Sequence, residues 1–196
     1  MIGNDIIDLK VASITTRWDD QRFIDKVFSN SEQDLIRKAT DPFRTIWIIW
    51  SMKESAYKIH VRRYLNRFFA PTQLKCQYVA LGKGLVNIDQ DEYITSSIIN
   101  EYYIYTIAVK NEPGTQRHLR SKCFFVNEAS YSSQHAYCYQ KIICDLSDSY
   151  KAPSQHFSIK KDQQDVPSIY KDGSKLPIPL TITHHGSLGA YAYLKT

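Results

Sequence analysis

Residues 43–65 read FRTIWIIWSMKESAYKIHVRRYL, and this stretch decides the fold. Asp41 and Pro42 precede it as an N-cap and a proline at the first helical position, so a long helix is predicted from there to about Asn66. Apolar side chains recur at helical spacing. This stripe comprises Phe43, Trp47, Trp50, Tyr57, Val61 and Tyr64.

Glu54 falls near the centre of this apolar stripe. An ionised carboxylate taken out of water costs several kcal/mol unless it is paired or bound to a cation. Lys53 and Lys58 flank the stripe, an arrangement that suits a divalent metal together with an anionic substrate such as a pyrophosphate. The alternative is a Glu54–Lys58 pair at i,i+4 on a solvated face, which contributes a few tenths of a kcal/mol.

A second acid is expected on an N-terminal strand. Residues Ile2 to Leu9 form a short run of β-forming residues after Met1, and alternation places Asp5 on the same face as Ile7 and Leu9. Asp8 falls on the other face, where a solvated or arginine-paired acid is expected. Downstream, Ser29 and Glu32 match a capping box at the start of a further helix, with Phe28 before it.

The remaining segments favour strands and an α+β fold. Strands are predicted in QLKCQYVALGKGLVNI (73–88), EYYIYTIAVKN (101–111), KCFFVNEA (122–129), PIPLTITHH (177–185) and GAYAYLK (189–195). The segment HAYCYQKIICDL (135–146) suits a strand or a short helix. Proline and glycine in NEPG (111–114) indicate a junction, so two similar lobes are expected, residues 1–112 and 113–196, with antiparallel sheet packed on the long helix.

Composition limits the function classes. The chain has 196 residues, 43% of them apolar, and a net charge of +5 that favours anionic partners, without the dense basic clusters of a nucleic-acid binder. No run approaches the about 18 apolar residues of a membrane span, and the N-terminus lacks a signal-peptide pattern, so a cytoplasmic protein is expected. The four cysteines show no C-x-x-C spacing and are expected to be reduced thiols.

Five motifs together carry a family resemblance. They are GNDIID (3–8), FS followed by Glu32 (28–32), WSMKESAYK (50–58), DGSKLP (172–177) and TITHH (181–185). The third matches the pattern W-x-x-K-E-[AS]-x-x-K, and the last two are similar to a G-K-P turn and an S-x-S-H strand. With these motifs the chain resembles the 4′-phosphopantetheinyl transferase superfamily, in the motif order of the holo-acyl-carrier-protein synthases.

The resemblance implies a reaction and its residues. Asp5 and Glu54 would hold Mg²⁺ against the pyrophosphate of coenzyme A, while the serine hydroxyl of an acyl- or peptidyl-carrier protein attacks the β-phosphorus and 3′,5′-ADP leaves. Lys58 would bind the pyrophosphate and neutralise its growing charge. Lys53 and Glu54 are both candidates to accept the serine proton. Such enzymes serve fatty acid or secondary metabolite biosynthesis.

The C-terminal motif implies contacts to coenzyme A. Thr183 and His184 would meet the coenzyme from the second lobe, and His185, one residue further along the strand, faces the other side. The sequence assigns no role to His60, His118, His135 or His156. Ile7 stands where two-lobed, Sfp-like members carry a further acidic ligand, so the metal would take two protein carboxylates and more water or phosphate oxygens.

The resemblance also implies partners and assembly. Lys10, Arg17 and Arg22 follow the acidic strand, where the holo-acyl-carrier-protein synthases use basic residues to dock an acidic carrier protein. The length of the chain favours a monomeric pseudodimer over the homotrimer of the shorter enzymes. Two other functions remain open: a catalytically silent protein that binds coenzyme A or a carrier protein, and another Mg²⁺-dependent phosphotransferase, although no G-x-x-x-x-G-K-[ST] loop is present.

Overall fold

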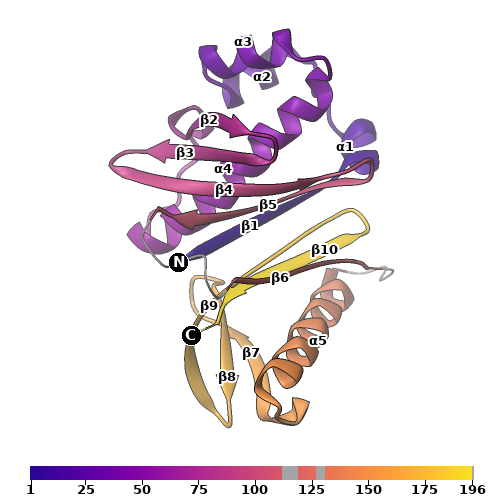
Figure 1. The fold of residues 1–196 in the computed structure, drawn as a ribbon, viewed down its shortest axis with the longest axis vertical. Coiled ribbons are helices and arrows are strands. Elements are labelled where there is room, and N and C mark those ends of the chain that lie inside the picture. Colours follow the sequence, from indigo (N-terminus) through magenta and orange to yellow (C-terminus); the bar gives the residue numbers. More distant parts are fainter. Residues whose placement is uncertain (112–118, 127–130, 196) are drawn as a thin grey trace.

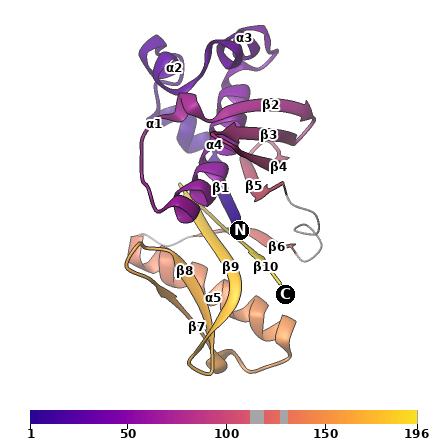
Figure 2. The same cartoon turned by 90° about the vertical axis from the view of Figure 1, so that its left-hand side faces the viewer.

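The computed structural model describes residues 1–111, 119–126 and 131–195, which form two five-stranded antiparallel sheets and their helices (Figures 1 and 2). The first sheet has the order β1-β5-β4-β3-β2 and the second the order β6-β10-β9-β8-β7. The first contains β1 (Ile2–Asp8), β2 (Lys75–Ala80), β3 (Lys83–Ile88), β4 (Asp91–Ile99) and β5 (Tyr103–Lys110). The second contains β6 (Leu119–Phe125), β7 (Phe157–Lys161), β8 (Pro167–Lys171), β9 (Ser174–His185) and β10 (Leu188–Leu194).

The helices begin where short polar side chains cap them. Four are α1 (Leu9–Thr15), α2 (Gln21–Val27), α3 (Asn30–Lys38) and α4 (Pro42–Tyr64), with Asp8, Asp20, Ser29 and Asp41 as their N-caps. The fifth is α5 (Tyr131–Tyr150). Short 3₁₀ helices occupy η1 (Pro71–Gln73) and η2 (Ser154–His156). The predicted long helix and the predicted capping box of Ser29 and Glu32 are both confirmed.

Each sheet has its own helix, and Figure 1 shows the first sheet above the second, with β1 next to β10. Helix α4 covers one face of the first sheet, and α5 packs on β10 and β7 of the second. Between the two sheets lies a separate core formed by β1, β5 and β10, including Ile2, Ile6, Tyr105, Ile107, Leu188 and Ala190. The two sheets therefore meet around β1, which packs against β9 and β10.

Alternation along β1 determines which layer each side chain meets. Ile6 belongs to the core between the sheets, whereas Ile7 belongs to the core beneath α4. Gly3 lies against α4 so closely that a Cβ there would approach the carbonyl oxygen of Ser55 to 2.0 Å. Asp5, two residues on from Gly3, shares this helix-facing side, so the first predicted acid is held between β1 and α4.

One predicted boundary and one missed strand need correction. The segment 135–146, expected to be a strand or a short helix, is helical and lies within α5, a helix of 20 residues that packs on β10 and β7. The strand β4 was not predicted, and β1 ends at Asp8 because Leu9 begins α1. Of the predicted 111–114 junction only Asn111 is among the described residues. Within the described residues, no helix combines the length and the apolarity needed to cross a membrane.

Candidate active site between the two sheets

Asp5 is a buried carboxylate with an unsatisfied oxygen. Its Oδ1 lies 3.5 Å from the Lys58 Nζ and 3.5 Å from the Thr183 Oγ1, a residue of the second sheet. Its Oδ2 is buried without a hydrogen-bond partner. Burial raises the pKa of Asp5, while the charge of Lys58 and the side chain of Ser51 act in the opposite direction. Added positive charge beside this carboxylate would favour its ionised form.

Glu54 faces the same region from α4. The side chain is half-buried. Burial and then the negative charge of Asp5 raise the pKa of Glu54 to about 7, and Lys58 opposes them. The two predicted acids are thus brought within each other's electrostatic field, although they are far apart in the sequence.

These two carboxylates could hold a divalent metal ion. Among residues 1–111, 119–126 and 131–195 no group of three or more histidines, cysteines and acids is placed to bind a metal. Mg²⁺ commonly uses one or two protein carboxylates and fills its other positions with water and substrate phosphate oxygens. The buried, unsatisfied Oδ2 of Asp5 fits such a site, and so does the mutual repulsion of Asp5 and Glu54.

Lys58 lies beside the two acids. Its Nζ donates a hydrogen bond of 2.6 Å to the backbone carbonyl oxygen of Asn4, and its side chain is 26% exposed. The ammonium therefore remains accessible to a ligand while it is held next to Asp5. Lys58 thus lies beside Asp5, between α4 and β1.

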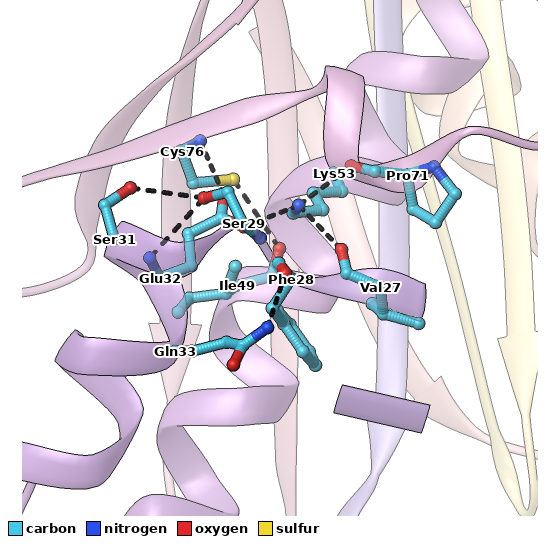
Figure 3. Close-up of polar contacts among 10 residues, drawn as sticks. All are labelled: Val27, Phe28, Ser29, Ser31, Glu32, Gln33, Ile49, Lys53, Pro71 and Cys76. Atoms are coloured by element: carbon cyan, nitrogen blue, oxygen red, sulfur yellow. Dashed lines mark hydrogen bonds and ion pairs between the residues drawn. The ribbon is translucent and has the colours of Figure 1, made fainter. Parts of the chain in front are cut away.

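Lys53 is placed differently from the expectation. Its Nζ donates to the Glu32 Oε2 at 2.7 Å, to the Val27 carbonyl at 2.9 Å and to the Pro71 carbonyl at 2.8 Å (Figure 3). An ammonium has three N–H bonds, so all of them are used. Lys53 therefore joins α4 to α3 and to η1, and its ammonium is directed away from Asp5.

Glu32 completes this buried network. One of its carboxylate oxygens accepts from the backbone N–H of Ser29, in the capping box, and the other accepts from the backbone N–H of Cys76 (Figure 3). Burial of Cys76, with Glu32 beside it, raises the pKa of the thiol well above its usual value. The thiol is therefore protonated at neutral pH. The Lys53–Glu32 pair was not predicted.

The phase of α4 also differs from the predicted stripe. The predicted stripe residues other than Trp47 are only half-buried, and Tyr64 is 50% exposed. The most buried apolar residues lie on an adjacent face of the helix, namely Ile46, Ile49, Met52, Ala56 and Ile59. Lys53, at 1% exposure, is consequently the buried charge on α4, and Glu54 lies at the edge of the buried face.

Strand β9 brings the second sheet to the site. Thr181 donates to the Asn4 side chain at 2.8 Å, and Thr183 reaches Asp5 as described above. The Nδ1 of His185 accepts the backbone N–H of Asp8 at 2.9 Å, so this histidine, expected to be incidental, links the two sheets. Asp8 is buried and accepts from the backbone and side chain of Ser187, which corrects the expectation of a solvated acid.

His184, on β9, lies beside helix α5. Its ring lies 5.5 Å from the ring of His135 on α5, nearly perpendicular to it. Burial, followed by the charges of Lys58, His185 and Lys161, lowers the pKa of His184. His135 was assigned no role from the sequence. No sequence signal could have found it, because only the packing of α5 on the sheet brings it to β9.

Two cavities flank the turn of α4 between Glu54 and Lys58. One, of about 240 Å³, is mainly apolar and is lined by Lys53, Glu54, Tyr57, Phe68, Phe69, Ala70, Pro71 and Leu74. The other, of about 310 Å³, is polar and is lined by Lys58, Arg62, His135, Lys161, Asp165, Pro167, Ile182, Thr183 and His184. Glu54 therefore lines the apolar cavity, while Lys58 and Arg62 of the same helix line the polar one.

Comparisons with known proteins point to one family. Residues 1–108 match the family described as the 4′-phosphopantetheinyl transferase superfamily. No curated protein matches the chain. Among solved structures, the chain is similar to holo-[acyl-carrier-protein] synthase of Helicobacter pylori in complex with coenzyme A, with 15% identity and a TM-score of 0.46 over 57% of this chain and 100% of that chain.

Two further solved structures are similar in the same way. The holo-[acyl-carrier-protein] synthase of Neisseria meningitidis is 17% identical, with a TM-score of 0.46 over 57% of this chain and 97% of that chain. The synthase of Thermotoga maritima is 13% identical, with a TM-score of 0.44 over 87% of this chain and 82% of that chain.

Proposed function

The chain belongs to the 4′-phosphopantetheinyl transferase superfamily, and from this premise we propose that it transfers the 4′-phosphopantetheine arm of coenzyme A to a serine of an acyl- or peptidyl-carrier protein, as a holo-acyl-carrier-protein synthase does. One observation carries the proposal. The buried, unsatisfied Oδ2 of Asp5 lies in the same region as Glu54 and Lys58 of the WSMKESAYK helix. Two acids and an accessible base together suit a pyrophosphate and its metal ion.

Asp5 and Glu54 are the proposed ligands of Mg²⁺. When bound, the ion would neutralise the pyrophosphate oxygens on which charge grows. The Lys58 ammonium adds a fixed positive charge at the same place, and a fixed cation costs no reorganisation during the reaction. The hydrogen bond from the Lys58 Nζ to the Asn4 carbonyl oxygen keeps this charge in position.

The proposed step is a displacement at the β-phosphorus. The serine Oγ forms a bond to phosphorus, the bond from phosphorus to the oxygen of 3′,5′-ADP breaks, and the leaving group takes the electron pair. The Glu54 carboxylate accepts the serine proton directly or through a water. We assign this role to Glu54 rather than Lys53 because all three N–H bonds of Lys53 are already used.

The two cavities suit the two ends of coenzyme A. The apolar cavity beside Glu54 has about 240 Å³, below the roughly 300–1,000 Å³ of clefts that enclose drug-sized ligands, so it suits a slender chain such as the pantetheine arm. The polar cavity beyond Lys58 suits the anionic nucleotide end. His184 and Thr183, which line the polar cavity, would then meet the coenzyme from the second sheet.

We further propose that residues 1–112 and 113–196 act as the two lobes of one pseudodimer. Each sheet draws its strands from one of these segments, and the two sheets have the same strand order. Thr183 of the second segment reaches Asp5 of the first. One chain thus carries both sides of the proposed site, which favours a monomer over a homotrimer.

Intact-mass analysis of an apo carrier protein tests the transfer. The carrier is incubated with this protein, coenzyme A and Mg²⁺, and one phosphopantetheine arm is expected to be added, with none in EDTA. Asp5→Asn is expected to abolish the gain, whereas the control Glu101→Gln, at an exposed turn, leaves it unchanged. No gain with several acyl- and peptidyl-carrier proteins would reject the proposal, and retained coenzyme A binding would then indicate a silent binding protein.

A further inference from the structure

Ser51 carries a buried hydroxyl on α4 that lacks a hydrogen-bond partner. Its side chain is 0% exposed, and among the residues that the structure describes no group has hydrogen-bond geometry to its Oγ. A serine hydroxyl is both a donor and an acceptor, and burying it unpaired is unfavourable. Such a group calls for a reason, and an ion that binds beside it is one.

Helix α4 and strand β1 run in opposite directions where they pack. The Arg62 side chain, near the end of α4, donates to the carbonyl oxygen of Ile2, at the start of β1. Earlier on α4, the carbonyl oxygen of Ser55 lies against Gly3, where a Cβ would approach it to 2.0 Å. Earlier residues of the helix therefore lie beside later residues of the strand.

This packing places Ser51 beside Asp5. Ser51 stands one turn before Ser55, about 6 Å back along the helix, and Asp5 follows Gly3 by about 7 Å along the strand. The electrostatics agree with this placement. Burial raises the pKa of Asp5, whereas the charge of Lys58 and, after it, the side chain of Ser51 act in the opposite direction.

Two unsatisfied polar atoms therefore lie close together. One is the Ser51 Oγ, and the other is the Asp5 Oδ2, which is also buried without a partner. Lys58 and Thr183 both lie beside the other carboxylate oxygen, Oδ1. A hydroxyl that donates to a carboxylate makes a short, charge-assisted hydrogen bond, so Ser51 can supply the donor that Oδ2 lacks.

We propose that Ser51 is a positioning residue for the metal site: its hydroxyl donates a hydrogen bond to the Asp5 carboxylate when that carboxylate holds the ion. The ion rests on the proposed function, whereas the proximity of the two unsatisfied atoms does not. The hydrogen bond restricts rotation of the carboxylate, so less freedom is lost when the ion binds. Hydrogen bonds to metal ligands commonly change the affinity of the metal by about 10–100-fold. Ser51 thus acts through Asp5 and is not itself a proposed ligand.

Binding of Mn²⁺ alone tests this role, because it needs neither coenzyme A nor a carrier protein. Free Mn²⁺ is measured by electron paramagnetic resonance during titration of the native chain, Ser51→Ala, Ser51→Cys and the matched control Thr95→Val. Thr95 also has a buried hydroxyl without a partner, but it lies on β4, which β5 separates from β1. Urea unfolding in EDTA gives the stability of each metal-free variant.

Ser51→Ala is expected to weaken Mn²⁺ binding by about tenfold. Its free energy of unfolding in EDTA should equal or exceed that of the native chain, because the change removes an unpaired buried hydroxyl and alanine favours a helix more than serine does. Ser51→Cys should weaken Mn²⁺ binding similarly, because a thiol fills the space but is a weak donor. Thr95→Val should leave the Mn²⁺ affinity unchanged.

Three results would overturn the inference. The first is an unchanged Mn²⁺ affinity in Ser51→Ala. The second is native affinity in Ser51→Cys, which would assign the effect to side-chain volume. The third is an equal loss in Thr95→Val, which would assign it to the packing beneath α4. A native chain that binds no Mn²⁺ would reject the metal site and this inference together.

The outcomes separate the role of Ser51 from the transfer activity. A chain whose Mn²⁺ affinity depends on the Ser51 hydroxyl but which modifies no carrier protein would keep the positioning role and reject the transferase. A chain that modifies a carrier protein, and binds Mn²⁺ equally tightly with and without this hydroxyl, would keep the transferase and reject the positioning role.

Discussion

The Nζ of Lys53 lies 2.7 Å from the Oε2 of Glu32, and both side chains are only 2% exposed. Residues 53 and 54 are adjacent on α4, yet successive helical positions differ by about 100° in direction. Lys53 therefore turns into the protein to meet Glu32, while Glu54 turns towards Asp5 and the apolar cavity. In the K-E pair of the motif, Lys53 holds α4 to α3, and Glu54 is the proposed metal ligand.

Lys53→Met is expected to destabilise the fold. The change leaves the carboxylate of Glu32 buried without its counter-ion and leaves the Val27 and Pro71 carbonyls without a donor. Breaking one side of a buried pair costs about 3–5 kcal/mol. Urea unfolding measures this loss as a fall in the free energy of unfolding.

A double variant supplies the control for Lys53. Glu32→Gln removes the stranded charge, and its single amide oxygen keeps one of the two backbone acceptors, for Ser29 or for Cys76, at the loss of one hydrogen bond of about 1 kcal/mol. Lys53→Met with Glu32→Gln should therefore be more stable than Lys53→Met alone. If the double variant is as unstable as the sum of the two single changes, the ion pair is not what holds α4 to α3.

Glu54→Gln is expected to lower turnover by at least about a hundredfold while the protein stays folded. The amide cannot accept the serine proton, and it weakens the proposed metal site. Stability should be equal or higher, because burial and Asp5 already disfavour the ionised carboxylate, whose pKa is raised to about 7. Single-turnover kinetics and thermal melting are the measurements, and full activity would remove Glu54 from the mechanism.

Lys58→Met is expected to lower kcat more than it raises KM. The ammonium stabilises charge that grows only in the transition state, and removal of one such group costs about 10²–10³ in kcat. Lys75→Met is the matched control, because Lys75 is an exposed lysine on the edge strand β2. A rise in KM alone would show that Lys58 binds ground state and transition state equally.

Asp8→Asn should reduce stability at neutral pH and not at acidic pH. Burial alone would raise the pKa of Asp8, but hydrogen bonds from Val11 and from the backbone and side chain of Ser187 outweigh burial and lower the pKa below its ordinary value. An acid whose folded-state pKa is lowered stabilises the fold at pH values above its unfolded-state pKa of about 4. This stabilisation is lost as the pH falls through the folded-state pKa. The difference in the free energy of unfolding between the native chain and Asp8→Asn, about 1 kcal/mol at pH 7, should shrink from pH 5 to pH 3.

The Asp8 experiment has an internal check. Asparagine is as good an N-cap as aspartate, so helix α1 keeps its cap and the change acts on the charged link to Ser187. Unfolding by urea at a series of pH values gives this difference directly. A difference that does not vary with pH would assign the stability effect of Asp8 to packing.

Replacing Lys10, Arg17 and Arg22 together by glutamate should slow transfer to an acidic carrier protein. All three side chains are exposed, so the change reverses a basic surface without touching the core. The second-order rate constant should fall by at least about tenfold at low salt and less at high salt, because steering is screened. The affinity for coenzyme A should not change. If the carrier rate is unaffected, the carrier docks elsewhere.

Local signals in the sequence predicted the helices that have clear caps. Asp41 with Pro42, and Ser29 with Glu32, each act within one turn, so no tertiary knowledge was needed. The phase of α4 was harder to predict. Apolar residues nearly surround its first half, from Ile46 to Ile49, so sequence alone could not choose the buried face and Glu54 was placed too far inward.

Contacts between distant segments could not be predicted. The partners of Lys53 lie on three other segments, and His135 meets His184 only because α5 packs on the second sheet. The segment containing His135 has the aromatic and β-branched composition of a strand, and tertiary packing overrides that propensity. The motifs nevertheless named Asp5 and Glu54, which the structure brings within each other's field.

Because Thr183 of one segment contacts Asp5 of the other, the proposed site is expected to be insensitive to dilution. When the two sides of a site come from separate subunits, the complete site disappears as the protein concentration falls below the dissociation constant of the assembly. Here one polypeptide carries both sides, and such a tether gives an effective concentration of the order of millimolar. Specific activity measured at nanomolar protein should therefore equal that measured at micromolar protein.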